Sequence, residues 1–381
     1  MNKWPTVALH ELLTPADENI PVQQGSEYPN FGMYSFGRGL FEKPPISGAK
    51  TSAPSLRRVR AGNFVFSRLF AFEGAYGLVD DVFDGYFVSN EYPSFQIDTR
   101  RLNARFLKLY FQLPRVWQEV AIGSKGVGSR RVRVQPAQML THAIPLPPIS
   151  EQERIVSHFD GLAEKTRQLN EHLAAIEADA NSLLAERFSK IIQAAPVKPL
   201  AEIAPIIRRP AIIELTDQYP ELGVRSFGKG TFHKPALSGA EAGAKKLYRI
   251  EAGDLIFSNV FAWEGAIAIA GPEDNGRFGS HRFITCRTNE EITSARFLRY
   301  YFLTEKGLAQ IREASPGGAG RNRTLGLEKL MAIKVPIPSA EHQKSFEALL
   351  NQITELAARN ASIRDAGNAM IPATLERIFL R

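Results

Sequence analysis

The chain has 381 residues, 44% hydrophobic and 23% charged, which is typical of a folded protein of two or three domains. The net charge of +7 favours an acidic partner such as nucleic acid. The single cysteine excludes a disulfide within the chain and suits a reducing cytoplasm. The N-terminal residues lack the apolar core of a secretory signal, and no apolar run approaches 18 residues, so we expect a cytoplasmic protein without a membrane span.

Residues 1–149 predict a globular unit of mixed α/β type. Phe64–Phe66 follows the turn residues Ala61 to Asn63 and indicates a strand. Residues 104–112 carry aromatic and leucine side chains and indicate a short helix. A glycine-rich basic loop, GSKGVGSRRVRV, begins at Gly123. Strands followed by short helices and such a loop predict one compact domain.

Residues 150–193 carry the longest helical pattern of the chain. Prolines precede it, and Ser150 with Glu153 forms a capping-box pattern that predicts the helix start. Apolar positions then alternate at spacings of four and three, which is typical of a coiled coil. These positions are Ile155, Phe159, Leu162, Thr166, Leu169, Leu173, Ile176, Ala180 and Leu183. A helix of about 40 residues spans roughly 60 Å, so we expect a spacer or a coiled-coil arm.

The second half of the chain repeats the first with a constant shift of 191 residues. YSFGRGLFEKPPISGAK from Tyr34 returns as RSFGKGTFHKPALSGAE from Arg225, and 23 of 44 positions are identical between 32–75 and 223–266. Residues 194–338 therefore predict a second globular unit, and 339–381 a second helix. Its weaker seam contains Leu349, Ile353, Leu356, Asn360, Ile363, Gly367 and Met370.

The repeat predicts an α+β fold with an internal two-fold relation. Two helices with matching seams in one chain pack most simply on each other, and the intervening unit brings the chain back. We therefore expect two similar mixed α/β domains separated by a long antiparallel two-helix coiled coil, with pseudo-two-fold symmetry. The expected boundaries are 1–149, 150–193, 194–338 and 339–381.

Basic residues recur at equivalent places in the two globular units. Glycine lets a backbone approach phosphate closely, and arginine pairs bidentately with phosphate or guanine. SFGRG and SFGKG lack the strand-turn-helix context of a nucleotide-binding turn, so we interpret them as structural turns. Arg68 and Asn259 end the two FSR and FSN strands and can read guanine and adenine edges. The candidate DNA-binding residues are Arg38, Arg57, Arg68, Lys125, Arg130, Arg131, Arg133, Lys229, Tyr248, Asn259, Arg321 and Arg323. Solvated loops and strand ends facing solvent are the alternatives.

Catalytic motifs are not recognisable in the sequence. The histidines are scattered, Cys286 lacks a CxxC partner for zinc, and neither a Walker A pattern nor an amino-methyltransferase motif is present. Glu73 and Glu264 recur in FEGA and WEGA. A structural glutamate is the simpler interpretation, and an enzyme built on this pair is the alternative.

PLPPISEQERIV (145–156), leading into the long heptad helix, together with the second helix and the two globular units, resembles the specificity subunit of Type I restriction-modification systems. The resemblance covers essentially the whole chain, although the second junction, VPIPSAEHQ, is degenerate. It implies a non-catalytic subunit with two target-recognition domains, which reads a split double-stranded DNA site. It also implies two methyltransferase subunits as partners and, in some systems, restriction subunits. S-adenosylmethionine, Mg²⁺ and ATP are expected only on those partners.

The similarity of the two units predicts similar half-sites, and hence a nearly palindromic split target. Polar differences between the copies are candidates for half-site differences: Glu42/His233, Arg57/Tyr248, Arg60/Glu251, Arg68/Asn259 and Asn90/His281. The outer face of the first helix is the expected methyltransferase contact, with Glu153, Arg154, Lys165, Arg167 and Glu171. A coiled-coil adaptor that binds only proteins explains the helices, but not the duplicated basic loops.

Overall fold

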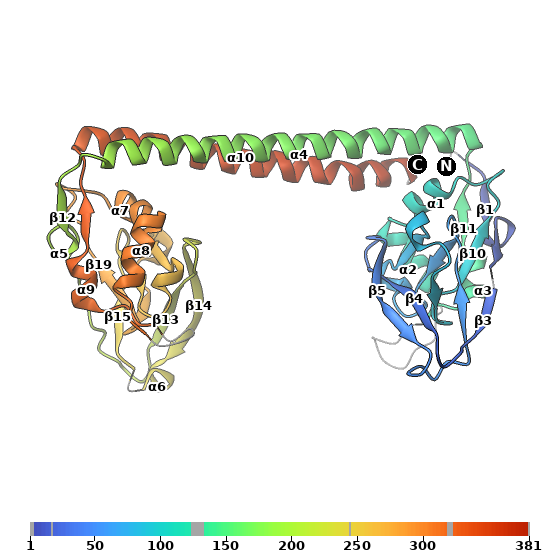
Figure 1. Ribbon diagram of the computed structural model, residues 1–381, viewed down its shortest axis with the longest axis horizontal. Helices are drawn as coiled ribbons and strands as arrows, with labels where there is room; N and C mark the ends of the chain where they lie inside the picture. Colours follow the sequence, from blue (N-terminus) through green and yellow to red (C-terminus); the bar gives the residue numbers. More distant parts are fainter. Residues whose placement is uncertain (1–3, 17, 123–132, 244, 318–322, 380–381) are drawn as a thin grey trace. The chain divides into compact units, whose positions relative to one another are not determined.

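The structure is a computed structural model that describes residues 4–16, 18–122, 133–243, 245–317 and 323–379 (Figure 1). Contacts divide the chain into unit 1, Met1–Leu173 with Asn360–Arg381, and unit 2, Ala174–Arg359. Both long helices contribute to both units. The α+β class is confirmed, whereas the four-part domain division stays a prediction.

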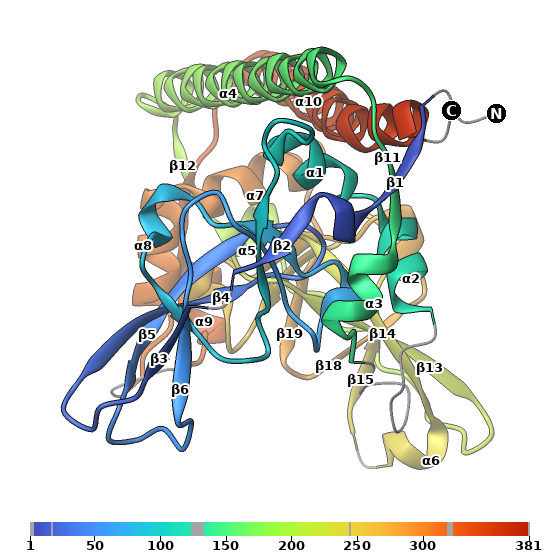
Figure 2. The ribbon, with the colours of Figure 1, turned by 90° about the vertical axis from the view of Figure 1, so that its right-hand side faces the viewer.

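Unit 1 contains three sheets, ordered β1-β11, β2-β10-β7-β8 and β3-β6-β9-β4-β5. In the five-stranded sheet, β4 pairs with β5 in antiparallel orientation, whereas β4 and β9 pair in parallel through Asn30 and Phe87. In Figure 2 the blue strands β4, β5 and β6 reach away from α4, and α1 lies between α4 and the sheets. The elements are β1 Thr6–Ala8, η1 Leu9–Glu11, β2 Leu13–Pro15, β3 Glu18–Pro21, β4 Glu27–Met33, β5 Leu40–Ser47, β6 Ser55–Arg58, β7 Phe64–Phe66, η2 Ala71–Glu73, β8 Tyr76–Leu78, η3 Asp81–Phe83, β9 Phe87–Val88, β10 Ser94–Ile97, α1 Ala104–Tyr110, α2 Pro114–Ala121, α3 Pro136–Thr141 and β11 Ala143–Pro145.

Unit 2 repeats this plan with the sheets β12-β20, β17-β16-β19 and β14-β13-β18-β15. The parallel pair recurs between Glu221 of β13 and Phe278 of β18. The elements are β12 Val197–Pro199, α5 Leu200–Ile203, β13 Gln218–Val224, β14 Thr231–Ser238, α6 Gly239–Ala242, β15 Leu247–Arg249, β16 Leu255–Ser258, η4 Ala262–Glu264, β17 Ile267–Ile269, η5 Pro272–Asp274, β18 Phe278–Ser280, β19 Phe283–Cys286, α7 Ala295–Leu303, α8 Glu305–Glu313, α9 Leu327–Ala332 and β20 Lys334–Pro336.

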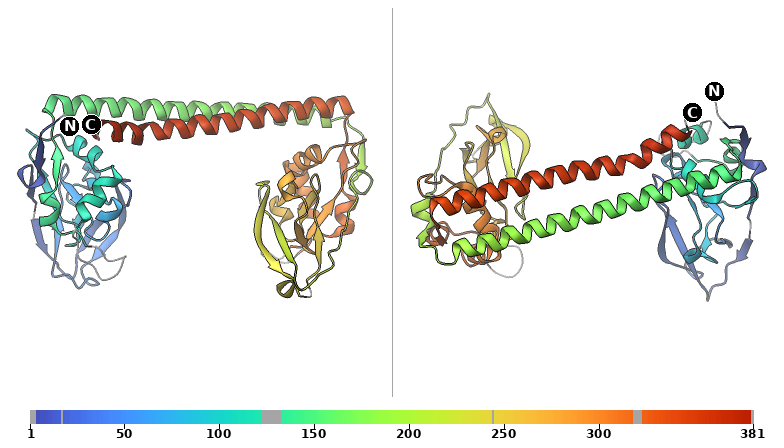
Figure 3. Two further views of the ribbon diagram at one scale, coloured as in Figure 1. Left: turned by 180° about the vertical axis from the view of Figure 1, so that it is seen from behind. Right: turned by 90° about the horizontal axis from the view of Figure 1, so that it is seen from above.

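The two long helices are α4, Ile149–Ile192, and α10, Ala340–Phe379 (Figure 3). In unit 1 the first half of α4 lies beside the last half of α10, and Asn170 Nδ2 donates to Asn368 Oδ1 at 3.4 Å. In unit 2 Phe188 near the end of α4 packs on Phe346 near the start of α10, with ring centroids 4.9 Å apart. The predicted antiparallel pairing of the two helices is therefore confirmed within each unit.

A buried glutamine ties the start of each long helix to its globular part. Gln152 is fully buried, and its Nε2 donates to the carbonyls of Pro147 (2.8 Å) and Arg101 (2.9 Å), while its Oε1 accepts from the Asn103 amide (2.8 Å). Gln343, its equivalent, donates to the matching carbonyls of Ile292 and Pro338, while its Oε1 accepts from the Thr293 hydroxyl at 2.8 Å. The predicted capping box at Ser150 is wrong, because α4 starts at Ile149 and the Pro148 carbonyl accepts from the Glu151 and Gln152 amides.

The predicted seam is buried at Ile155, Phe159, Leu173, Asn360 and Gly367, but it departs from the heptad pattern at other positions. Leu184 is 3% exposed and Leu183 is 55% exposed, so the predicted seam position Leu183 is wrong. Phe188 continues this face and packs on Phe297 of α7 at 5.3 Å. In α10 the predicted seam positions Ile363 and Met370 are also exposed, whereas Ile371 packs on the core of unit 1. Burial against a globular core therefore outweighs strict heptad spacing here.

Candidate nucleic-acid interface

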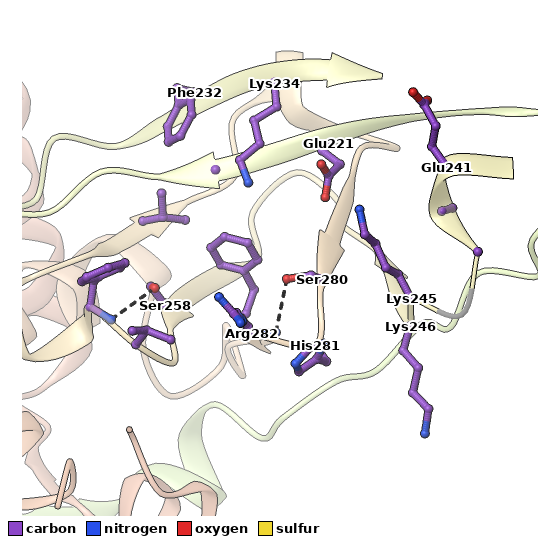
Figure 4. A pocket seen from close by; sticks show the side chains of 17 residues that line it. Glu221, Phe232, Lys234, Glu241, Lys245, Lys246, Ser258, Ser280, His281 and Arg282 are labelled. Carbon is purple, nitrogen blue, oxygen red and sulfur yellow. Dashed lines mark hydrogen bonds between the residues drawn. The ribbon is translucent and has the colours of Figure 1, made fainter. Parts of the chain in front are cut away.

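An open cleft of about 1060 Å³ lies on unit 2 between the β13–β14 hairpin and the loop that joins β18 to β19. Positive side chains outnumber the two glutamates, Glu221 and Glu241, in its lining. They are Lys234 from β14, Lys245 and Lys246 after α6, and Arg282 from the loop. In Figure 4 the ammonium groups of Lys234 and Lys245 extend to either side of Glu221, while Lys246 points away. A mainly cationic cleft with an apolar floor suits a polyanion that also presents flat rings.

Phe261, which precedes η4, joins this cleft to an aromatic and basic surface. Its ring is 42% exposed and lines the cleft, and its amide donates to Ser258 Oγ at 3.3 Å. Two residues further, the Trp263 ring lies 5.2 Å from the guanidinium carbon of Arg323. Arg323 thus stacks on an aromatic face at the end of the second glycine-rich loop. Alternating cations and aromatic rings are typical of surfaces that bind nucleic acid.

The strand-end residues Arg68 and Asn259 lie where two loops converge in each unit. The Arg68 amide donates to the Glu91 carbonyl (2.9 Å), and the Arg68 carbonyl accepts from Val134 (3.0 Å). Asn259 makes the same two main-chain bonds, with Arg282 at 2.7 Å and Leu325 at 2.8 Å. The two side chains therefore occupy equivalent sites.

Their surroundings differ between the two units. In unit 1, Arg68 Nη2 donates to Gln135 Oε1 at 2.7 Å, and the Arg133 guanidinium pairs with the Glu91 carboxylate at 3.0 Å. In unit 2, the position of Glu91 is taken by Arg282, which lines the cleft. Among the described residues, the side-chain oxygen of Asn259 is buried without a hydrogen-bond partner. The two near copies thus present different charges at one place.

One predicted difference between the copies is an ion pair with its charges exchanged. Arg60 lies 3.0 Å from Glu18 in unit 1, and Glu251 lies 3.1 Å from Arg209 in unit 2. The shift of 191 places Glu18 on Arg209 and Arg60 on Glu251. This exchange preserves the pair and is explained without a DNA contact.

Two other differences also have partners within their own unit. Glu42 accepts from the Tyr86 hydroxyl at 3.3 Å, and His233 Nε2 lies 2.9 Å from the buried Asp274 carboxylate. Tyr248, on β15, lies under the Arg208 guanidinium at 4.6 Å. Its equivalent, Arg57, lies on β6 opposite Val88. His281 lines the cleft, which leaves the pairs Asn90/His281 and Arg68/Asn259 nearest to the converging loops.

Both SFG turns present their basic residue outward, as predicted. Arg38 and Lys229 are exposed, and Glu73 and Glu264 hold the turns through hydrogen bonds from the Ser35 and Ser226 hydroxyls. The glutamates are therefore structural in the described geometry. Within the described residues no cluster of histidine, cysteine and carboxylate side chains could hold a metal ion, and no described helix is long and apolar enough to cross a membrane.

The expected partner-binding residues all lie in the unit 1 half of α4. Arg154 pairs with Glu151 at 2.7 Å, and Arg167 lies between Glu164 and Glu171 at 2.7 and 2.5 Å. The hydrogen bonds from Arg167 and Gln168 lower the pKa of Glu164 to about 2. Glu153 and Lys165 are exposed. This face is a charged, solvated surface, and its role as a partner contact stays a prediction.

Sequence reasoning missed several residues that the structure brings to this surface. Lys234, Lys245, Lys246, Arg282 and the exposed Phe261 line the cleft of unit 2, and the exposed Phe227 lies beside η4. In unit 1 the exposed Phe36 and Phe70 lie beside η2. The FEGA/WEGA repeat signalled these turns, but local patterns do not place distant lysines in one cleft. Lys125, Arg130, Arg131 and Arg321 lie outside the described residues.

Solved structures match the fold over nearly the whole chain. The HsdS subunit from Thermoanaerobacter tengcongensis has a TM-score of 0.62 at 18% identity, covering 99% of this chain and 96% of that one. A chain from work on complex assembly and conformational transition of the type I R-M system has a TM-score of 0.68 at 17% identity, covering 99% and 97%. No protein-family profile and no curated protein matches the sequence. The chain therefore has the fold of an HsdS specificity subunit.

Proposed function

We propose that this chain is a DNA-specificity subunit of a Type I restriction-modification complex. The observation that carries the proposal is the fold likeness over 99% of the chain to HsdS, a subunit whose name denotes that role. Two repeated units, each with a basic and aromatic surface, support recognition of a split double-stranded site. Phosphate contacts would position each unit, and a few side chains would read base edges.

The chain acts in this proposal as a recognition subunit without catalysis of its own. Two methyltransferase subunits, and restriction subunits where the system has them, would bind along α4 and α10 in the cytoplasm. S-adenosylmethionine, Mg²⁺ and ATP would be held by those partners. Because the units are near copies, the two half-sites would be similar and the full target nearly palindromic.

Co-purification with the cognate methyltransferase, followed by mapping of methylated sites, tests the proposal. We expect a stable complex that methylates one split sequence with related, inverted half-sites, and DNA binding that weakens steeply with salt. Two unrelated half-sites would refute the near-palindrome but not DNA recognition. A complex that forms with protein partners but binds DNA without sequence preference would instead support the adaptor reading.

A further inference from the structure

Two phenylalanines adopt a backbone conformation that this residue type rarely accepts. Among the described residues, Phe36 (φ 65°) and Phe227 (φ 59°) are the non-glycine positions with positive φ. They are equivalent in the repeat, and glycines with φ of 65° and 64° follow them. Turns with two such residues favour asparagine, aspartate or glycine at the first position. A bulky residue is costly there, and such strain is concentrated at functional sites.

The strained turns are held firmly by the neighbouring 3₁₀ helices. The Phe36 amide donates to the Glu73 carbonyl at 2.7 Å, and the Gly37 amide to the Gly74 carbonyl at 2.9 Å. In unit 2 the same bonds, from Phe227 and Gly228, measure 2.9 and 2.8 Å. The hydroxyls of the preceding serines donate to the Glu73 and Glu264 carboxylates. Each turn is therefore a rigid mount for the phenylalanine at its tip.

Both phenylalanines are largely exposed beside cations, and the Phe36 ring also lies 6.2 Å from the Trp117 ring. Phe36 is 63% exposed and Phe227 is 72% exposed, so burial does not repay the strain. The Arg38 guanidinium lies 5.8 Å from the Phe36 ring and 5.0 Å from the ring of the exposed Tyr34. Lys229 lies 5.9 Å from the Phe227 ring. Each tip is an apolar wedge with a positive charge at its base.

The wedge in unit 2 adjoins the basic cleft through η4. Phe261, just before η4, lines the cleft, while Glu264 at its end holds the Phe227 turn. The cleft and the wedge thus flank one short helix. Aromatic and cationic side chains are exposed beside these turns, while Gln112 in unit 1 and Leu303 in unit 2 pack beneath the turn glycines. Exposed rings beside cations suit stacked bases and phosphates better than an apolar protein interface.

We propose that Phe36 and Phe227 are DNA wedges, each of which inserts between stacked base pairs of one half-site while Arg38 or Lys229 contacts the adjacent phosphate. This inference rests on the proposed function and extends it to the deformation of the DNA. The two wedges would unstack one base step in each half-site. The strain in the turn keeps the ring rigid and exposed before binding, which lowers the ordering cost of insertion.

The test uses the complex of the full chain with its methyltransferase, and duplexes that carry the mapped target. 2-Aminopurine replaces one base at a time, at positions other than the methylated base, and its fluorescence rises when the base is unstacked. We expect a rise at one step in each half-site. Phe36→Asn should abolish the rise in one half-site only, and Phe227→Asn in the other, each with about tenfold weaker binding.

Matched variants separate stacking from folding. Asparagine accepts positive φ, so the Asn variants should melt no earlier than the wild type. Phe36→Trp should keep the fluorescence rise. If the Asn variants keep the wild-type fluorescence rise and affinity, the wedge proposal is wrong, but the proposed function still stands. If the Asn variants instead lose co-purification with the methyltransferase while the DNA is still unstacked, the wedge proposal is wrong and the phenylalanines contact a protein. A wild-type complex without sequence-specific binding would overturn the proposed function and the wedge together.

Discussion

At the scale of a single residue, the thiol of Cys286 can report on the unfolding of unit 2. It is the only cysteine of the chain, it is fully buried in β19, and burial raises the pKa of its thiol to about 12. Both inaccessibility and the scarcity of thiolate make a buried thiol inert.

We expect native Cys286 to resist alkylation by iodoacetamide at pH 8 and to react only when unit 2 unfolds. The unfolded thiol ionises from about pH 9, whereas the folded thiol stays protonated to about pH 12. The folded state therefore binds more protons in this window, and its stability falls as the pH rises from 9 to 12. Labelling rates measured by mass spectrometry across pH and denaturant check this. Rapid labelling of the native protein would contradict it.

The two arginines of the charge-exchanged pairs differ in burial and in their other partners, because Arg209 contacts Asp254 as well as Glu251, which predicts unequal energies. Arg209 is 19% exposed and contacts the fully buried Asp254 carboxylate at 2.7 Å. Arg60 and Glu18 are 51% and 38% exposed. Solvent screens the second pair, whereas removal of Arg209 leaves a buried carboxylate with the more exposed Arg287 at 3.3 Å.

Arg209→Met should destabilise unit 2 by about 3 kcal/mol. The matched control Arg60→Met in unit 1 should cost under about 1 kcal/mol. Urea unfolding followed by far-UV circular dichroism measures both, and Cys286 labelling assigns the first loss to unit 2. Equal costs for the two variants would show that burial does not set the value of this pair.

At the scale of the element, the long helix serves two packing surfaces at once. The half-buried Ile176 and Ala180 are followed by the buried Leu184 and Phe188, each four residues after the one before. A run of fours departs from the heptad and locally unwinds a supercoil. The last turns of α4 can then face α7 as well as α10, as the contacts of Phe188 with both Phe297 and Phe346 illustrate.

Adjacent leucines provide a direct test of this change in spacing. Leu184→Ala removes a side chain that is 3% exposed and should cost about 3 kcal/mol. Leu183→Ala removes one that is 55% exposed and should stay within about 0.5 kcal/mol. Urea midpoints of the two variants decide the point. A larger loss of stability in Leu183→Ala than in Leu184→Ala would support the strict heptad seam instead.

At the scale of the whole molecule, near copies in one chain make an exchange experiment possible. Arg68 and Asn259 have the same main-chain partners, so replacing one by the other changes the side chain without changing its mount. If the two residues read guanine and adenine edges, the exchange transfers a base preference between half-sites.

Arg68→Asn should therefore shift the methylated sequence in one half-site and leave the other unchanged. Arg131→Gln, in the basic glycine-rich loop, is the control for phosphate contacts and should weaken binding to all sequences while lowering the salt slope by about one. Methylation mapping and binding at several salt concentrations distinguish the two. A uniform loss of affinity in both variants would contradict these roles.

The amino-acid pattern alone determined the duplication, the two long helices, the short helix after the strands and the outward turns at Arg38 and Lys229. These features follow from local periodicity, prolines, glycines and a repeat of constant shift, which act over short stretches of chain. For the same reason the sequence placed basic residues in matching loops of the two units.

Only the tertiary structure decided which faces and partners those elements use. The seam moved from Leu183 to Leu184 because the helix packs on a core that includes Phe297 and Phe346, which lie more than 100 positions further along the chain. The clamps at Gln152 and Gln343, the exchanged pair of Glu18 and Arg60, and the cleft around Lys234 join residues that are distant in sequence. Local pattern reports which way a side chain points along its own element, whereas partner choice depends on how the elements pack.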